Sequence, residues 1–255
     1  MNLEARLPQD KLDKCRLLLC EFLSKQKVTL KQLQSLIGLL NHACYVVVYA
    51  RAFLRRLIDL TIGITKPHHH IRLTQQVKLD LRVWQEFLEN FNGRAFFLDE
   101  DFLNGNYLEL YTDASGSIGY GAVYGAQWFY GIWPLSWQSR NIAVLELFPI
   151  VAAVEVWGSA WANKSVCFRT DNEALVPVIN KQTSREPHIM ALIRRLVLTC
   201  LSFYINFMAR HVPGQANILA DKLSRGQVYE FRNLAPGVDV VPTQLPVHCL
   251  PENCD

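Results

Sequence analysis

Four acidic residues stand at points where this sequence predicts that strands and helices meet. Asp113 comes directly after an alternating strand, and Asp171 comes directly after a second, apolar strand. Glu146 interrupts an otherwise apolar stretch one turn into a long helix, and Asp221 begins the last helix. Because ligand sites in α/β proteins gather at the ends of strands, we expect Asp113, Glu146 and Asp171 to converge.

Carboxylates that lie close together repel one another, and bound divalent cations would neutralise their charge. Oxygen ligands without histidine or cysteine favour Mg²⁺, with Mn²⁺ as a substitute. Two such ions about 4 Å apart can bind both the attacking water and the leaving oxygen of a phosphodiester. Any one of these acids alone would favour a surface or helix-capping role, but as a set they indicate phosphodiester hydrolysis.

The elements that must position these acids begin at Tyr107, where the hydrophobic pattern changes to alternation. Three strands separated by Gly-rich turns predict an antiparallel meander. A long helix, a buried strand, two helices, a fifth strand and a short helix follow. The predicted ranges, in chain order, are 107–112, 119–125, 127–134, 142–161, 165–170, 172–180, 185–203, 203–210 and 217–224.

Apolar residues at helical spacing dominate the part of the chain before this sheet. Arg51 and Arg55 are four residues apart in one of these helices and therefore share a face. That face is either a stripe that contacts phosphates or an ordinary solvated surface. The run His68-His69-His70 favours a loop, and residues 99–106 favour a linker. The predicted helices cover residues 10–24, Thr29 to Leu40, about 43–60, and 74–90.

Charge is divided unevenly between the two halves of the chain. Residues 1–90 carry 14 Lys and Arg against 8 Asp and Glu, whereas residues 91–255 carry 12 against 15. A basic part beside an acidic part is consistent with one part that binds a polyanion and another that concentrates carboxylates for metal ions.

Composition excludes several other classes of protein. With 50% hydrophobic and 19% charged residues the chain is not mainly disordered. Seven cysteines without CxxC spacing argue against a disulfide framework and a zinc ribbon. The polar opening MNLEARLPQDK is no signal peptide, and no apolar stretch near it approaches the ~20 residues of a membrane span. We therefore expect an intracellular protein, cytoplasmic or nuclear, without a membrane partner.

Four blocks of sequence resemble the successive active-site blocks of ribonuclease H domains, in that family's order and spacing. They are YTDASGSIGYGAVYG, NIAVLELFPIVAAV, FRTDNEALVPVINK and ARHVPGQANILADKLSR. Upstream, LPQDKLDKCRLLLCEFL, VTLKQLQSLIGLLNHACYVV and ARAFLRRLIDL resemble the segment that joins polymerase to ribonuclease H in reverse transcriptases. The resemblance is closest to DIRS-type retrotransposons, which integrate with a tyrosine recombinase, and it covers about residues 7 to 245.

This resemblance implies an α/β fold: a ribonuclease H-like five-stranded mixed sheet flanked by helices, preceded by a small helical region. The helical region, residues 1–98, would correspond to the thumb or connection of a reverse transcriptase. Residues 106–226 would form the ribonuclease H-like domain, and residues 227–255 an extended C-terminal tail.

The resemblance also implies cleavage of the RNA strand of RNA–DNA hybrids. In the family, the acids that match Asp113, Glu146, Asp171 and Asp221 bind two Mg²⁺, and the histidine that matches His211 assists proton transfer or product release. The residues expected to contact the substrate are Ser115, Gly116 and Asn172 near the acids and Lys27, Lys31, Arg51, Arg55 and Arg56 in the basic half.

Several alternatives stay open at this point. The sequence has no YxDD-like polymerase motif, so the polymerase portion of a reverse transcriptase is an expected partner, and no small-molecule cofactor is expected. A catalytically inactive nucleic-acid-binding or scaffold module, or a DNA nuclease on the same fold, would be compatible with the same blocks. Metal-dependent cleavage and substrate preference distinguish them.

Overall fold

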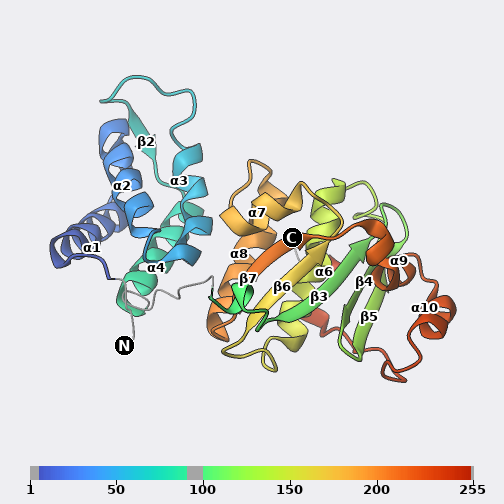
Figure 1. Ribbon diagram of the computed structural model, residues 1–255. Helices are drawn as coiled ribbons and strands as arrows, with labels where there is room; N and C mark the ends of the chain where they lie inside the picture. Colours follow the sequence, from blue (N-terminus) through green and yellow to red (C-terminus); the bar gives the residue numbers. More distant parts are fainter. Residues whose placement is uncertain (1–5, 91–99, 254–255) are drawn as a thin grey trace. The chain divides into compact units, whose positions relative to one another are not determined.

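The computed structural model describes residues 6–90 and 100–253 of the chain. It divides into two compact units, Met1–Phe97 and Leu98–Asp255 (Figure 1). Each unit has its own core and is described by itself. No helix among the described residues combines the length and the apolar character needed to cross a lipid bilayer.

The N-terminal unit is built mainly from helices. Leu19, Phe22, Leu33, Leu81 and Trp84 come from three of them and are fully buried together in its core. Thr29 caps the start of the second helix with a reciprocal capping box. Its side chain accepts a hydrogen bond from the Gln32 backbone N–H, and the Gln32 side chain accepts one from the Thr29 backbone N–H. The elements are α1 (Gln9–Ser24), β1 (Lys27–Thr29), α2 (Leu30–Ala43), η1 (Val48–Phe53), α3 (Arg55–Asp59), β2 (His70–Arg72) and α4 (Gln75–Asn90).

The single helix expected over residues 43–60 is wrong. A turn follows α2, and the 3₁₀ helix η1 and the five-residue helix α3 take its place. The consecutive β-branched residues Val46 and Val47 explain the break, because β-branched side chains lose χ1 freedom in a helix. Arg51 and Arg55 therefore do not lie on one continuous α-helix.

A short antiparallel ribbon of β1 and β2, which the sequence did not predict, joins the start of α2 to the turn before α4. Its register pairs Lys27 with Arg72, Val28 with Ile71 and Thr29 with His70. Of the histidine run, His68 and His69 lie in a turn and loop as expected, while His70 begins β2.

The C-terminal unit contains the expected five-stranded mixed sheet, in the order β5-β4-β3-β6-β7. The strands β3, β4 and β5 form the antiparallel meander, and β6 and β7 continue the sheet in parallel from β3. Parallel pairing brings the C-terminal ends of β3, β6 and β7 to one edge. The strands are β3 (Leu108–Ala114), β4 (Gly119–Tyr124), β5 (Gln127–Ile132), β6 (Ser165–Thr170) and β7 (Asn206–His211).

Helices cover both faces of this sheet (Figure 1), which confirms the predicted fold class. Successive residues of β4 show the two faces: Tyr120 packs against Phe148 of α6, whereas Gly121 lies against Leu223 of α9. On the α6 side, α8 packs against α6. The helices are α5 (Glu100–Leu103), α6 (Ile142–Trp157), α7 (Leu175–Lys181), α8 (Pro187–Ser202), α9 (Ile218–Ser224) and α10 (Val228–Leu234).

Residues 227–253 differ from the expected extended tail. Helix α10 buries Phe231 completely against Trp128 of β5, with ring centroids 5.0 Å apart. The chain then runs along β5, where the N–H groups of Asp239 and Thr243 donate to the carbonyls of Ala126 and Trp128 at 2.9 and 2.7 Å. Apolar burial and these hydrogen bonds hold the segment on the sheet.

The last described residues lie against α8, on the α6 side of the sheet. The guanidinium of Arg195 on α8 donates to the carbonyl of His248 at 2.7 Å, and Cys249 is fully buried. Two short 3₁₀ helices, η3 (Val247–Cys249) and η4 (Pro251–Asn253), complete the segment. A third, η2 (Gly214–Ala216), follows β7. We call residues 239–253 the C-terminal strap.

Candidate active site

Asp113, Glu146 and Asp171 come together at one edge of the sheet. One carboxylate oxygen from each lies within 4.8 Å of the others, a spacing that could hold a metal ion. Asp113 is near the end of β3, and Asp171 directly follows β6. Because β3 and β6 are parallel neighbours, their ends coincide, and α6 brings Glu146 to the same point.

Burial makes the charged form of Glu146 costly. Its side chain is only 6% exposed, and burial, followed by the charges of Asp113 and Asp171, raises its pKa to about 9. The backbone N–H of Ala114 donates to this carboxyl group and partly opposes the rise in pKa. Oxygen Oε2 of Glu146 is buried without a hydrogen-bond partner among the described residues. A buried acceptor without a donor is costly, and a cation would satisfy it.

Asp113 is held by a hydrogen bond that the sequence did not predict. Burial raises the pKa of Asp113 to about 6. A hydrogen bond from the fully buried hydroxyl of Ser224 lowers this pKa, while the charges of Asp171 and Asp221 raise it. Ser224 therefore stabilises the carboxylate form and fixes its orientation.

The donor set fits a hard divalent cation. All three side chains offer carboxylate oxygens, as Mg²⁺ and Mn²⁺ prefer. The raised pKa values of Asp113 and Glu146 and the unpartnered Oε2 of Glu146 all indicate missing positive charge at this point.

Asp221 is not part of this cluster of three. It lies on α9, close enough for its charge to raise the pKa of Asp113. Its Oδ1 accepts a hydrogen bond from Nε of Arg225, one turn further along the chain, at 2.6 Å. An ion that bound Asp221 would therefore compete with Arg225, a residue that sequence reasoning passed over although it stands four positions away.

His211 stands at the edge of the sheet where the acids gather. It ends β7, where it pairs with Thr170 of β6, the residue before Asp171. Its side chain is exposed. This position leaves the imidazole accessible to solvent and to a ligand at the carboxylate edge.

The residues expected to contact RNA near Asp113 and Asp171 have local partners. Oγ of Ser115 accepts from the N–H groups of Ile118 and Gly119, at 2.8 and 3.1 Å, and so closes the turn between β3 and β4. Oδ1 of Asn172 accepts from the N–H of Ala174 at 3.1 Å. A Cβ at Gly116 would meet no atom within 4 Å, so no contact of that atom inside the protein requires a glycine there.

The basic residues expected to contact phosphates lie in the N-terminal unit, and their environments differ. Lys27 and Lys31 are exposed. Arg51 interacts with the thiol of Cys44. Arg55 forms an ion pair with Asp59, and Arg56 forms one with the buried Asp80 at 2.6 Å. Lys27 and Lys31 thus remain available to a ligand, whereas the arginines already have partners within the unit.

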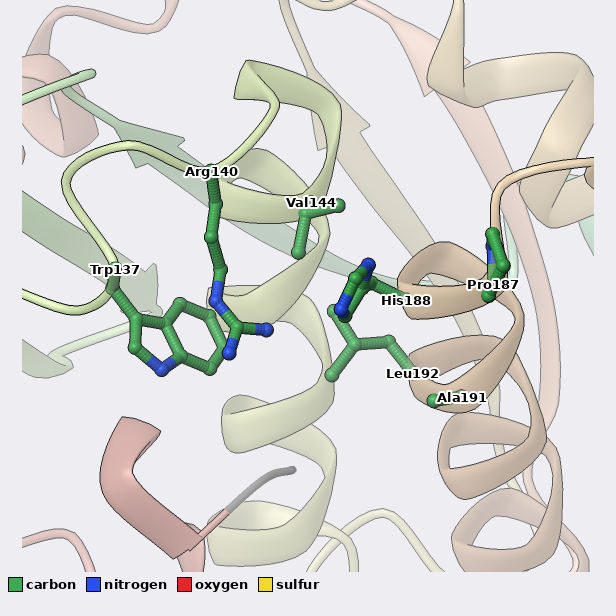
Figure 2. A pocket seen from close by; sticks show the side chains of 7 residues that line it. All are labelled: Trp137, Arg140, Val144, Pro187, His188, Ala191 and Leu192. Atoms are coloured by element: carbon green, nitrogen blue, oxygen red, sulfur yellow. The ribbon is translucent and has the colours of Figure 1, made fainter.

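A separate pocket of about 320 Å³ lies between α6 and α8. In Figure 2 the Arg140 side chain extends over Trp137 on one side, with its Cζ 4.2 Å from the ring centroid, and His188 and Leu192 of α8 stand opposite. Val144 of α6 also lines the pocket. Residues two apart on a helix point about 200° apart, so this pocket and the Glu146 carboxylate lie on different faces of α6.

No protein-family model and no curated protein sequence matches the chain. Solved structures do match. RNase H1 of the archaeon Halobacterium salinarum is 15% identical, with a TM-score of 0.38, over 49% of this chain and 97% of that one. The N-terminal RNase H domain of a Mycobacterium tuberculosis protein is 16% identical, with a TM-score of 0.36, over 51% of this chain and 98% of that one.

A further match reaches into a larger part of the chain. A foamy viral protease-reverse transcriptase, designated dRH and solved in complex with double-stranded DNA, is 19% identical with a TM-score of 0.29. The match covers 80% of this chain and 35% of the viral one. Because these identities and TM-scores are low, the carboxylate site itself has to carry any conclusion about function.

Proposed function

We propose that this protein is a metal-dependent ribonuclease H, which hydrolyses the RNA strand of RNA–DNA hybrids. The observation that carries the proposal is the cluster of Asp113, Glu146 and Asp171, one oxygen of each lying within 4.8 Å of the others. Oε2 of Glu146 is also buried without a hydrogen-bond partner among the described residues. The resemblance of four sequence blocks to ribonuclease H domains gives the substrate class.

In this proposal the three clustered carboxylates hold two Mg²⁺, for which Mn²⁺ can substitute, and Asp221 contributes when it leaves Arg225. Bound divalent ions supply Lewis-acid activation of water and stabilisation of the leaving 3′ oxygen. The protein orients the ligands. Ser224 holds the Asp113 carboxylate by its hydrogen bond, and the Ala114 N–H holds Glu146.

Other residues at the edge serve the substrate. His211, exposed beside Asp171, takes up or releases a proton during transfer or product release. The turn of Ser115 and Gly116 lies two residues after Asp113, and the open surface at Gly116 lets the backbone approach a ribose 2′-hydroxyl. Asn172 follows Asp171 and contacts the minor groove of the hybrid, where the 2′-hydroxyls lie.

We further propose that the chain is the thumb or connection region and the ribonuclease H of a DIRS-type retrotransposon reverse transcriptase. The sequence blocks upstream of residue 98 support this assignment. The polymerase portion of such an enzyme is then its expected protein partner.

The test is cleavage of an end-labelled RNA–DNA hybrid, beside duplex DNA and duplex RNA, in Mg²⁺, Mn²⁺ or EDTA. We expect metal-dependent cutting of the hybrid's RNA strand alone. Asp113→Asn should reduce the rate at least ~100-fold, because even residues that only support metal ligands account for 10–100-fold. Glu173→Gln is the matched control, since Glu173 is exposed and lies outside the cluster although it is two residues from Asp171.

Two outcomes would contradict the proposal. Equal cutting of duplex DNA would indicate a DNA nuclease on the same fold. Binding of the hybrid without cutting in either metal would indicate an inactive nucleic-acid-binding or scaffold module.

A further inference from the structure

The ribbon of β1 and β2 places two positive charges directly opposite each other. Lys27 pairs with Arg72 across the antiparallel strands. Directly opposed side chains on one face of such a pair have Cβ atoms about 5 Å apart, and like charges there are destabilising. Both side chains are exposed, so their proximity is not required by packing in the core.

Two further lysines belong to the same surface. Backbone hydrogen bonds from Leu30 to His69 and from Lys31 to Pro67 fasten the start of α2 to the turn before β2. Lys31 and Lys66 are therefore neighbours of the ribbon, and both are exposed. We call Lys27, Lys31, Lys66 and Arg72 the cationic ribbon.

No acidic residue is available to neutralise the cationic ribbon from nearby in the sequence. Residues 22–58 and 60–79 contain neither Asp nor Glu. None of the four cations has an ion-pair partner within residues 6–90 and 100–253.

Some other basic residues of the unit have acidic partners within it. Lys25 pairs with Glu21, and Arg56 pairs with the buried Asp80. No ion pair among the described residues offsets the charges of the cationic ribbon, so these charges remain available to an anion outside the unit.

We propose that the cationic ribbon binds the sugar–phosphate backbone of a nucleic acid, independently of base sequence. This inference deepens the proposed function, on which it rests for the choice of polyanion. Phosphates would relieve the repulsion between Lys27 and Arg72. His68, His69 and His70, exposed beside them, add ring N–H donors for phosphate oxygens.

The apolar residues of the ribbon favour nucleic acid over an anionic membrane. Val28 and Ile71 turn inward and are 1% and 6% exposed. Peptide segments that lie in a membrane interface combine their cations with apolar side chains that enter the lipid. The outward face of the ribbon carries Lys27, Thr29, His70 and Arg72 and no apolar residue.

The experiment measures affinity of the full chain for an RNA–DNA hybrid in EDTA, so that binding is separated from cleavage, across a series of KCl concentrations. Each phosphate contact contributes about 0.9 to the slope of log affinity against log salt. Lys27→Gln with Arg72→Gln should therefore lower that slope by about 1.8, equally for two hybrids of unrelated sequence. Lys11→Gln with Lys14→Gln is the control, because these exposed lysines lie on α1 beside Asp10 and Asp13.

A second variant separates binding from folding. Arg72→Glu places an opposite charge across from Lys27, so the free energy of unfolding should not decrease while hybrid affinity falls. A change that merely damaged the ribbon would lower both.

The outcomes are distinguishable from those of the cleavage test. An unchanged salt slope in the Lys27→Gln, Arg72→Gln variant would overturn the cationic ribbon even if the enzyme cuts hybrids. A reduced slope in a protein that cuts nothing would uphold the ribbon and overturn the proposed function. Tighter binding to phosphatidylserine vesicles than to any nucleic acid, lost in the same variant, would overturn nucleic acid as the ligand.

Discussion

Ionisation of the buried Glu146 carboxyl group is unfavourable in the folded protein. In the folded, metal-free protein its pKa is about 9, against about 4.3 for an exposed Glu. The folded state therefore binds this proton more tightly than the unfolded state. The stability that protonation provides is complete below about pH 4 and is lost as the pH rises toward 9.

We therefore expect Glu146→Gln to remove much of the pH dependence of stability in EDTA. Between pH 5 and pH 8, the free energy of unfolding of the unmodified protein should fall by on the order of 4 kcal/mol more than that of the variant. Urea unfolding at the two pH values measures this difference. Excess Mg²⁺ at pH 8 should restore the free energy of unfolding of the unmodified protein and change that of the variant less. If the free energies of unfolding of the two proteins depend on pH in the same way, the burial of this charge is contradicted.

Ser224 is expected to act through Asp113. Its hydroxyl is one of the influences that lower the pKa of Asp113, and a hydrogen bond to a charged group contributes roughly 1.5–3 kcal/mol. Ser224→Ala should therefore raise this pKa, and the pH midpoint of Mn²⁺ binding should move upward by about one pH unit. Titration of Mn²⁺ affinity from pH 5 to pH 8 measures the midpoint.

Ser202→Ala provides the control for Ser224→Ala. Both serine hydroxyls contact the carbonyl three residues earlier in a helix, at 2.8 Å in Ser202 and 2.9 Å in Ser224, but Ser202 has no carboxylate partner in the part of the chain that the structure describes. If both variants shift the midpoint equally, the hydrogen bond to Asp113 is not responsible.

The sequence predicted the three clustered acids from their places at strand ends and within one apolar helix. It did not predict the ion pair of Asp221 with Arg225, although the spacing of four residues allows it. It could not predict the hydrogen bond from Ser224 to Asp113, because that bond depends on how α9 lies on the sheet. Helical periodicity alone does not fix the rotation and depth of that helix.

At the scale of elements, α9 is positioned by the absence of a side chain on β4. A Cβ at Gly121 would lie 2.4 Å from Cβ of Leu223 and 3.1 Å from the backbone nitrogen of Ser224. Rotation of a flexible side chain cannot relieve these contacts, because one is with backbone and the other with a Cβ. The helix itself would have to move.

Gly121→Ala should therefore destabilise the C-terminal unit by roughly 1–3 kcal/mol through overpacking. It should also weaken Mn²⁺ binding, because α9 carries Asp221 and Ser224. Gly116→Ala is the control for stability, since a Cβ there would meet no atom within 4 Å. Urea unfolding of both variants tests the prediction, and equal stability would exclude this close approach.

Elements with long, clear periodicity were predicted from the sequence. The helices α1, α2 and α4 and all five strands of the sheet are examples. The prediction failed where local chemistry or distant contacts decide. β-branched residues break the expected helix at 43–60, and strands of three residues, such as β1, are too short to show a period of two. Helix α10 depends on Trp128, more than ninety positions earlier.

At the scale of the whole molecule, the unequal division of charge corresponds to two kinds of surface. The N-terminal unit carries exposed cations without ion-pair partners among its described residues, and the C-terminal unit carries clustered acids, two of them buried, that form no ion pair with its described residues. In the proposed function, the first unit supplies affinity that declines with salt and the second supplies chemistry that depends on divalent ions. Ionic strength and metal concentration should thus affect separate steps.

The C-terminal strap has a consequence for self-association. Strand β5 is the outer strand of the sheet, and an uncovered outer strand is a template for pairing with another chain. Asp239 and Thr243 occupy the carbonyls of Ala126 and Trp128 that such a partner would use. The segment that the sequence predicted to be an extended tail thus shields part of the sheet edge, and its loss would expose that edge to pairing with another chain.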